Sequence, residues 1–207
     1  MIPTGSKDLD NFLEDCEKNK INLIYGPAAS GKTTICLLAT ITKARENKKI
    51  IFIDTENSFS IERFQQLTNN QNELLQNILI LKIKNFNYQH KNIQQLEQIK
   101  NISLIVIDSF TNFYRRLVRS QPELAKAMLT KQLKILKSIS DKNIPILLTS
   151  QVYSDMKNNF LPLAHQILVR YCETIVKLEK DPKRKIKVIK PNKKEKYFEI
   201  TNEGIKI

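Results

Sequence analysis

A short segment from Gly26 to Thr34 carries the clearest chemical signal in the sequence. It matches the pattern G-x-x-x-x-G-K-[ST], whose glycines let the backbone fold around an anion and point N–H groups at a phosphate. A predicted helix follows, and its positive N-terminal end also favours the anion. Lys32 is expected to neutralise β- and γ-phosphate oxygens, and the Thr33 hydroxyl to ligate Mg²⁺. The predicted nucleotide-binding residues are Gly26, Pro27, Ala28, Ala29, Ser30, Gly31, Lys32, Thr33 and Thr34.

Three polar residues follow or end apolar runs that read as strands, namely Glu56, Asp108 and Gln151. An aspartate at a strand end near a phosphate loop is expected to ligate Mg²⁺, and a carboxylate on the next strand can orient or deprotonate the attacking water. We therefore assign Asp108 to the metal with Thr33, Glu56 to the water, and Gln151 to sensing the γ-phosphate. Lys32, Glu56 and Gln151 form the predicted catalytic group. Simpler roles remain open. Glu56 could be a carboxylate in solvent, Asp108 a helix N-cap, and Gln151 an amide at a strand end without a task.

The chain is strongly basic. It has 34 Lys and Arg against 21 Asp and Glu, a formal charge of +13, which makes polyanions plausible partners. Ten of these cations and only three acids fall between Lys177 and Lys196. A Lys-rich composition also arises from an AT-biased genome or from heat adaptation, so charge alone does not establish nucleic-acid binding.

The 207 residues can bury one sizeable core, and no linker or low-complexity block divides them, so we expect one domain over 1–207. The longest apolar runs are strand-sized, and the N-terminus has no export signal. Cys16, Cys36 and Cys172 lack paired spacing and are expected to be thiols in a reducing compartment. We therefore expect a cytoplasmic protein that does not enter a membrane.

Short apolar runs alternate with longer amphipathic segments. The predicted strands are 21–26, 49–56, 78–83, 103–109, 144–151, 174–180, 185–190 and 197–201. The predicted helices are 6–16, 32–46, 60–75, 89–100, 121–141 and 162–172, the last with Pro162 at its start. Alternation implies parallel pairing through right-handed crossovers, whereas only turn-like segments separate the last three strands. We predict an α/β fold with a mostly parallel central sheet flanked by helices, and an antiparallel basic meander over about 174–207.

Taken in order, the motifs resemble the RecA family of recombinases, and most closely its small archaeal RadB paralogs. The resemblance covers nearly the whole chain and implies a RecA-like P-loop NTPase core. The matching segments are TGSKDLDNFL (4–13), GPAASGKTT (26–34), IFIDTENSFSIERF (51–64), LIVIDSFTNFYRRL (104–117), LLTSQVY (147–153), PLAHQILVRYCETIVKLEK (162–180) and FEITNEGI (198–205).

This resemblance implies binding of ATP, Mg²⁺ and single-stranded DNA, weak hydrolysis, and assistance to a RadA-type recombinase or a Holliday-junction nuclease, with homo-oligomers left open. It also implies DNA-facing loops after the Asp108 strand and after Gln151. The first would offer stacking groups at Phe110, Phe113 and Tyr114 beside arginines. The predicted DNA-binding residues are Arg115, Arg116, Arg119, Lys157, Lys185, Lys187, Lys190, Lys193 and Lys194.

Other interpretations stay open at this point. A KaiC-like regulatory ATPase would act on protein partners, and a scaffold with decayed catalysis would only bind nucleotide. The arginines could be the solvated face of a helix, and the aromatic residues could pack in the core. The sequence also departs from the family pattern, because LEDCEKNK (13–20) replaces a glycine-rich turn, and Ala164 and His165 stand where glycines are expected.

Overall fold

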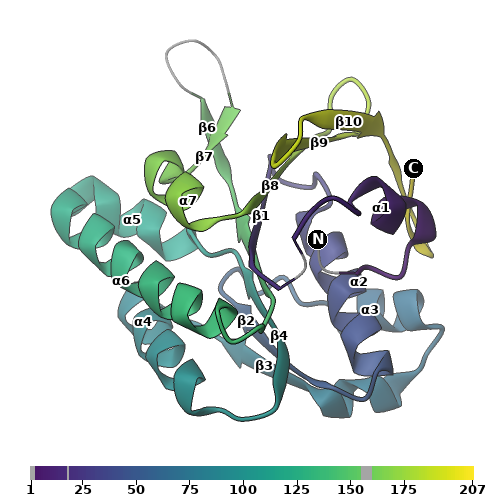
Figure 1. Ribbon diagram of the computed structural model, residues 1–207, viewed down its shortest axis with the longest axis horizontal. Coiled ribbons are helices and arrows are strands. Elements are labelled where there is room, and N and C mark those ends of the chain that lie inside the picture. Colours follow the sequence, from purple (N-terminus) through teal and green to yellow (C-terminus); the bar gives the residue numbers. More distant parts are fainter. Residues whose placement is uncertain (1–2, 18, 155–159) are drawn as a thin grey trace.

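The computed structural model describes residues 3–17, 19–154 and 160–207, and these form an eight-stranded sheet between two layers of helices (Figure 1). The strand order is β10-β9-β8-β1-β5-β4-β2-β3. Neighbours from β8 to β3 pair in parallel, whereas β9 and β10 pair antiparallel at one edge. The predicted α/β fold with antiparallel C-terminal strands is confirmed. The strands are β1 (Ile21–Tyr25), β2 (Lys49–Asp54), β3 (Ile78–Lys82), β4 (Ile102–Asp108), β5 (Ile146–Ser150), β8 (Thr174–Glu179), β9 (Lys185–Lys190) and β10 (Lys194–Tyr197).

Helices cover both faces of the sheet (Figure 1). One face carries α1 (Lys7–Phe12), α2 (Lys32–Arg45) and α3 (Ile61–Thr68). The other carries α4 (Phe86–Gln95), α5 (Asn112–Ser120), α6 (Pro122–Ser140) and α7 (His165–Tyr171). Two 3₁₀ turns follow α3 and α4, at Asn72–Asn77 and Leu96–Gln98.

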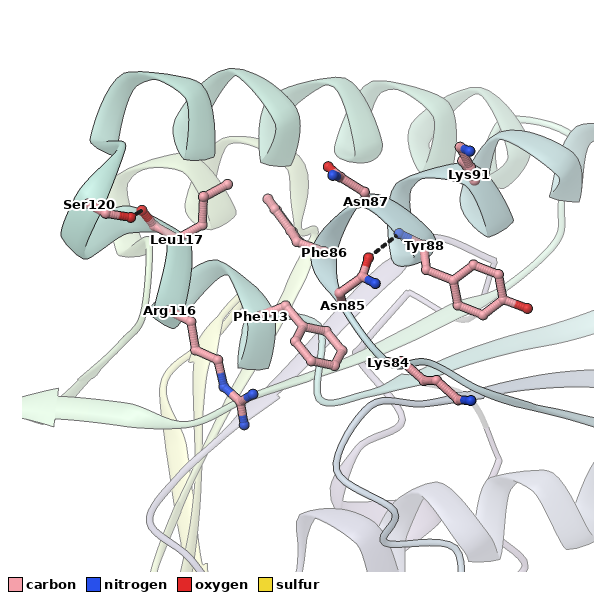
Figure 2. Close-up of a pocket in the computed structure, with 10 residues that line it drawn as sticks. All are labelled: Lys84, Asn85, Phe86, Asn87, Tyr88, Lys91, Phe113, Arg116, Leu117 and Ser120. Carbon is pink, nitrogen blue, oxygen red and sulfur yellow. Dashed lines mark hydrogen bonds between the residues drawn. The ribbon is translucent and has the colours of Figure 1, made fainter.

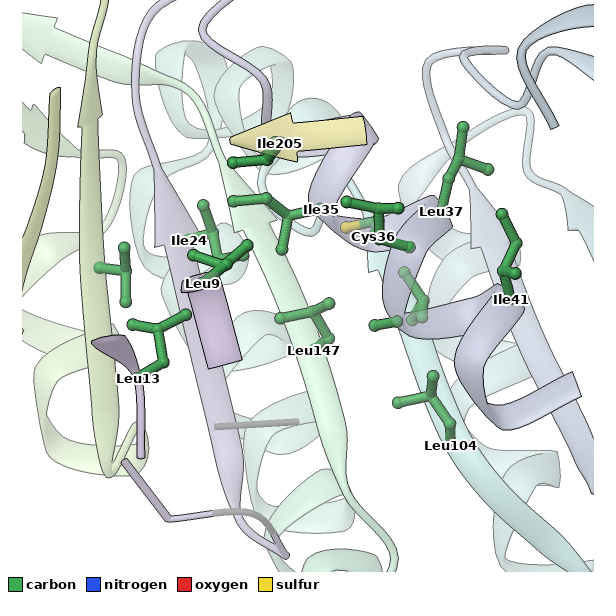
Figure 3. Packing of buried hydrophobic residues seen from close by; sticks show 14 of the residues in the cluster. Leu9, Leu13, Ile24, Ile35, Cys36, Leu37, Ile41, Leu104, Leu147 and Ile205 are labelled. Atoms are coloured by element: carbon green, nitrogen blue, oxygen red, sulfur yellow. The ribbon is translucent and has the colours of Figure 1, made fainter. Parts of the chain in front are cut away.

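Alternation along the central strands divides the core into two clusters, because successive side chains of a strand point to opposite faces. In β1, Leu23 packs with the cluster under α4, α5 and α6, whereas Ile24 packs with the cluster under α1 and α2. Figure 3 shows Leu9, Ile35 and Ile205 gathered over the strand that holds Ile24. The near-continuous apolar strands are therefore buried on both faces, as parallel strands usually are.

Several predicted helix boundaries were wrong, for local reasons. The helix expected to reach residue 75 ends at Thr68, because Asn69 and Asn70 adopt left-handed backbone angles of 53° and 65° in φ. The helix expected from 89 begins at Phe86, because the Asn85 side chain accepts a hydrogen bond from the Tyr88 N–H and caps it. The helix predicted over 6–16 covers only Lys7–Phe12.

Pro162 does not start a helix. It ends β7 (Phe160–Pro162), which pairs antiparallel with β6 (Val152–Ser154). These two strands form a small separate sheet after Gln151. α7 begins three residues later at His165. Proline fits here because it has no N–H to donate, and the outer edge of a two-stranded ribbon requires no donor.

The last predicted strand, 197–201, is divided at Phe198. Phe198 is buried in the core with α1 and α2, and its N–H still donates to the Arg184 carbonyl beside β9. The chain leaves the sheet after it. The residues beyond it form a separate hairpin of β11 (Glu199–Thr201) and β12 (Gly204–Lys206). The antiparallel meander on the sheet is therefore β8, β9 and β10. In the described part of the chain, no helix is long and apolar enough to cross a membrane.

Candidate nucleotide-binding site

The loop between β1 and α2 is shaped as an anion cradle. A Cβ at Gly26 would lie 2.5 Å from the Leu178 carbonyl oxygen, and Gly31 has φ of 106°, a backbone conformation that side chains disfavour. The Ser30 hydroxyl is buried without a hydrogen-bond partner among the described residues. A buried polar atom of this kind is expected to find a partner. The cradle and the orphaned hydroxyl both fit a bound phosphate.

Lys32, the first residue of α2, is buried and folds back over this loop. Its ammonium donates to the carbonyl oxygens of Gly26 and Pro27, at 2.9 and 2.8 Å. Burial lowers the pKa of Lys32, while the negative charges of Asp108 and Glu56 act in the opposite direction. The ammonium is thus held at the loop, where phosphate oxygens could replace carbonyl oxygens as its acceptors.

Thr33 and Asp108 lie side by side, as expected for two ligands of one Mg²⁺. The Thr33 hydroxyl donates to Asp108 Oδ2 at 2.6 Å, and Asp108 is 2% exposed at the end of β4. Ser58 and Thr149 also donate hydroxyls to the same carboxylate. One hydroxyl and one carboxylate suit Mg²⁺, which takes few protein ligands and keeps several waters or phosphate oxygens. The Asp108 carboxylate therefore accepts hydrogen bonds from three side-chain hydroxyls and does not cap a helix.

Asp54 is a site residue to which the sequence assigned no role. It is 1% exposed at the end of β2, and its carboxylate accepts the backbone N–H groups of Glu56, Ser58 and Phe59 at 3.2, 3.0 and 3.0 Å. These bonds fold the segment after β2 into a tight turn that presents Glu56. An aspartate two residues before a candidate catalytic carboxylate was the available signal, since such side chains form turns with the backbone that follows.

Glu56, Gln151 and Arg115 form a hydrogen-bonded chain. Gln151 Nε2 donates to Glu56 Oε1 at 2.8 Å, and Arg115 Nη1 donates to Gln151 Oε1 at 2.9 Å. Partial burial and the charge of Asp108 raise the pKa of the Glu56 carboxyl, although its side chain reaches solvent. A carboxylate with a raised pKa is a better proton acceptor. Three segments far apart in sequence therefore meet here.

The segment after the Asp108 strand is mainly a helix, α5, not a loop. Phe110 in the turn before it, and Phe113 and Tyr114 in its first turn, are at most 6% exposed, so they pack in the core and are not free to stack on bases. The expectation that these rings face DNA is wrong, because a helix places residues 113, 114 and 117 on one face, and this face packs against the core. Arg115, Arg116 and Arg119 lie on its exposed face.

The predicted basic residues of the C-terminal strands are largely paired. Lys185 contacts Glu195, Lys187 contacts Glu179 and Glu195, and Lys194 contacts Asp15. The Lys190 ammonium donates to the Cys172 carbonyl at 2.7 Å, and Lys193 is exposed. Lys157 lies outside the described residues. Three of these five lysines thus form ion pairs and a fourth binds a backbone carbonyl.

Fold and site together define the core of a P-loop NTPase: a phosphate loop leads from the central parallel strand β1 into a helix, and carboxylates stand at the ends of β4 and β2, two strands that pair with each other. The chain belongs to the Rad51 family, which matches it over residues 1–207.

Several similar proteins are RadB proteins of archaea. The "DNA repair and recombination protein RadB" of Thermococcus sibiricus is 38% identical over 220 residues, covering 99% of this chain and 94% of that protein. That of Methanococcus maripaludis strain C7 is 40% identical over 169 residues, covering 79% and 78%. The structure titled "Crystal structure of the RadB recombinase" superposes with a TM-score of 0.83 at 32% identity, covering 99% of this chain and 98% of that one.

Proposed function

We propose that the chain binds ATP and Mg²⁺ at the phosphate loop, binds single-stranded DNA, and hydrolyses ATP slowly as an accessory protein of DNA repair and recombination. The relatives named as DNA repair and recombination proteins support this biological setting. A RadA-type recombinase or a Holliday-junction nuclease is the protein partner that this role implies.

The observation that carries the proposal is the chain of hydrogen bonds from Glu56 through Gln151 to Arg115. Glu56 and Gln151 follow the ends of β2 and β5, where a γ-phosphate would approach, and Arg115 stands on the exposed face of α5. A γ-phosphate that attracts the Gln151 amide would break its bond to Glu56 and change what Arg115 is bonded to. The nucleotide could in this way control a cation that faces DNA.

Each residue of the loop has a defined task in this proposal. Lys32 balances charge on the β- and γ-phosphates, and Thr33 and Asp108 hold Mg²⁺, which stabilises the charge that develops on the phosphate oxygens. Glu56 orients the attacking water and accepts its proton. Its exposed position and its hydrogen bond to Gln151 leave it poorly placed for rapid turnover, which fits weak hydrolysis.

The test is ATP turnover with and without single-stranded DNA, measured for the wild type and for Glu56→Gln. We expect DNA to stimulate the wild type, and the variant to lose about 100-fold in turnover while it still binds ATP, since a general base contributes about 10²–10⁴-fold. Turnover that ignores DNA, with phosphorylation of the protein's own Ser or Thr residues, would instead favour a KaiC-like regulatory ATPase. Equal turnover in both proteins would leave a nucleotide-binding scaffold.

A further inference from the structure

A groove on the surface lies between the start of α4 and α5, and we call it the α4–α5 groove (Figure 2). Its volume is about 590 Å³. Figure 2 shows Arg116 beside the Phe113 ring on one side, and Lys84 and Tyr88 on the other. The lining residues are Lys84, Asn85, Phe86, Asn87, Tyr88, Lys91, Phe113, Arg116, Leu117 and Ser120.

The charge of this groove is one-sided. Lys84, Lys91 and Arg116 line it, and no acidic residue does. All three cations are exposed, and within the described part of the chain none of them forms an ion pair. Neighbouring like charges of this kind repel one another unless an anion comes between them. The groove therefore favours an occupant with several negative charges.

The groove also offers an aromatic surface. Tyr88 is 47% exposed, a large apolar ring left in solvent on the first turn of α4. The Asn85 cap fixes the start of this helix and so the position of the ring. Phe113 forms part of the floor, with the Arg116 guanidinium 5.6 Å from its ring centroid. Proteins that bind single-stranded nucleic acids combine cations with exposed aromatic rings, because the cations bind phosphates and the bases stack on the rings.

The groove continues into a hollow on the Glu56 and Gln151 side of the nucleotide site. This second hollow, lined by Glu56 and Gln151, shares Lys84, Phe113 and Arg116 with it. An occupant of the groove would therefore lie next to the chain of Glu56, Gln151 and Arg115.

We propose that the α4–α5 groove binds a segment of single-stranded nucleic acid, with Lys84, Lys91 and Arg116 on its phosphates and a base stacked on Tyr88. This inference rests on the proposed function and adds α4 to the DNA-binding surface, an element that the sequence did not single out. A second copy of the chain is a poorer occupant, because the net charge of +13 makes two copies repel.

The test uses fluorescence anisotropy of a labelled oligo(dT) with the full chain, ATP and Mg²⁺, over a series of salt concentrations. We expect Lys84→Ala with Lys91→Ala to weaken binding about tenfold at low salt, and to reduce the slope of log K against log salt by about 1.4, since each phosphate contact on a single strand contributes about 0.7. Tyr88→Ala should weaken binding at least about fivefold through the lost stack, and Tyr88→Phe should restore it.

The matched control is Lys134→Ala with Lys142→Ala, which removes the same charge from exposed positions on and just after α6. An equal loss in this control would assign the effect to net charge and overturn the inference. If the wild type binds but the groove variants bind equally well, the inference is wrong while the proposed function stands. If the wild type does not bind at all, both are wrong. Thermal unfolding of each variant checks that its fold is retained.

Discussion

Two basic regions of this molecule differ in how their charges are balanced. On the C-terminal strands, Lys185 and Lys187 share Glu195, and Lys187 also reaches Glu179. In the α4–α5 groove, Lys84, Lys91 and Arg116 have no acidic neighbour in the lining. The lysines that the sequence selected on these strands are therefore partly neutralised by ion pairs, although cations still outnumber acids there. The smaller group of cations without an ion pair among the described residues lies beside the nucleotide site.

The same contrast holds for two carboxyl groups. At the nucleotide site, burial and the charge of Asp108 raise the pKa of Glu56. On the C-terminal strands, hydrogen bonding to Lys185 holds the pKa of Glu195 below its usual range. The negative charge of Glu56 is thus unfavourable where it stands, whereas that of Glu195 is stabilised by a lysine. Groups whose pKa is shifted by burial and by a nearby charge of the same sign are more typical of functional sites.

Removal of Lys32 is the strongest way to test this contrast. We expect Lys32→Ala to lower ATP affinity by about 100-fold or more, since truncating one partner of a buried charge pair costs about 2–5 kcal/mol. Lys187→Ala, which removes an equal charge from a paired position, should leave ATP affinity unchanged. Isothermal titration calorimetry measures both. A similar loss in the two variants would contradict the distinction between the regions.

A medium effect is expected from the arginines of α5. Arg115→Ala with Arg116→Ala should weaken single-stranded DNA binding about tenfold and reduce the salt slope by about 1.4. Lys185→Ala with Lys187→Ala should change the slope much less, because the acids already neutralise these cations. Anisotropy titrations over a salt series compare the two pairs. If the lysine pair shows the larger loss, the C-terminal strands are the main DNA surface.

The smallest effect concerns stability and pH. The pKa of Glu56 is raised in the folded state, so folding favours its protonated form, and the unfolding free energy falls as pH rises from the unfolded pKa through the folded one. Glu56→Gln removes this fall in unfolding free energy, because glutamine does not ionise. At neutral pH it should be more stable than the wild type, by less than about 1 kcal/mol because solvent screens the carboxylate.

Glu195→Gln should have the opposite sign at neutral pH, because it removes a carboxylate whose pKa is lowered. Urea unfolding of both variants at pH 7 and near pH 4 measures the difference. The gain from Glu56→Gln should disappear at the acid end. A gain that persists there would show that packing, and not the carboxylate charge, causes it.

Much of the candidate site could be predicted because its signals are local. A glycine pattern between a strand and a helix, and polar residues at strand ends, depend on a few consecutive residues. Lys32, Thr33 and Asp108, which these local signals selected, lie close together in the structure. The helix at 112–120 and the break at Phe198 were missed because a short amphipathic run and a buried aromatic have meaning only against their packing partners.

The sequence by itself determined the alternation of the parallel strands with most of their helices, the phosphate loop and the polar residues at the strand ends, because periodicity and backbone preferences act over short distances. Tertiary structure alone decided which charges are neutralised and which polar groups meet. Lys194 finds Asp15 across 179 positions, and Gln151 finds Glu56 across 95. Coulomb and hydrogen-bond energies depend on distance in space, so no count of lysines along the chain could distinguish the paired strands from the open groove.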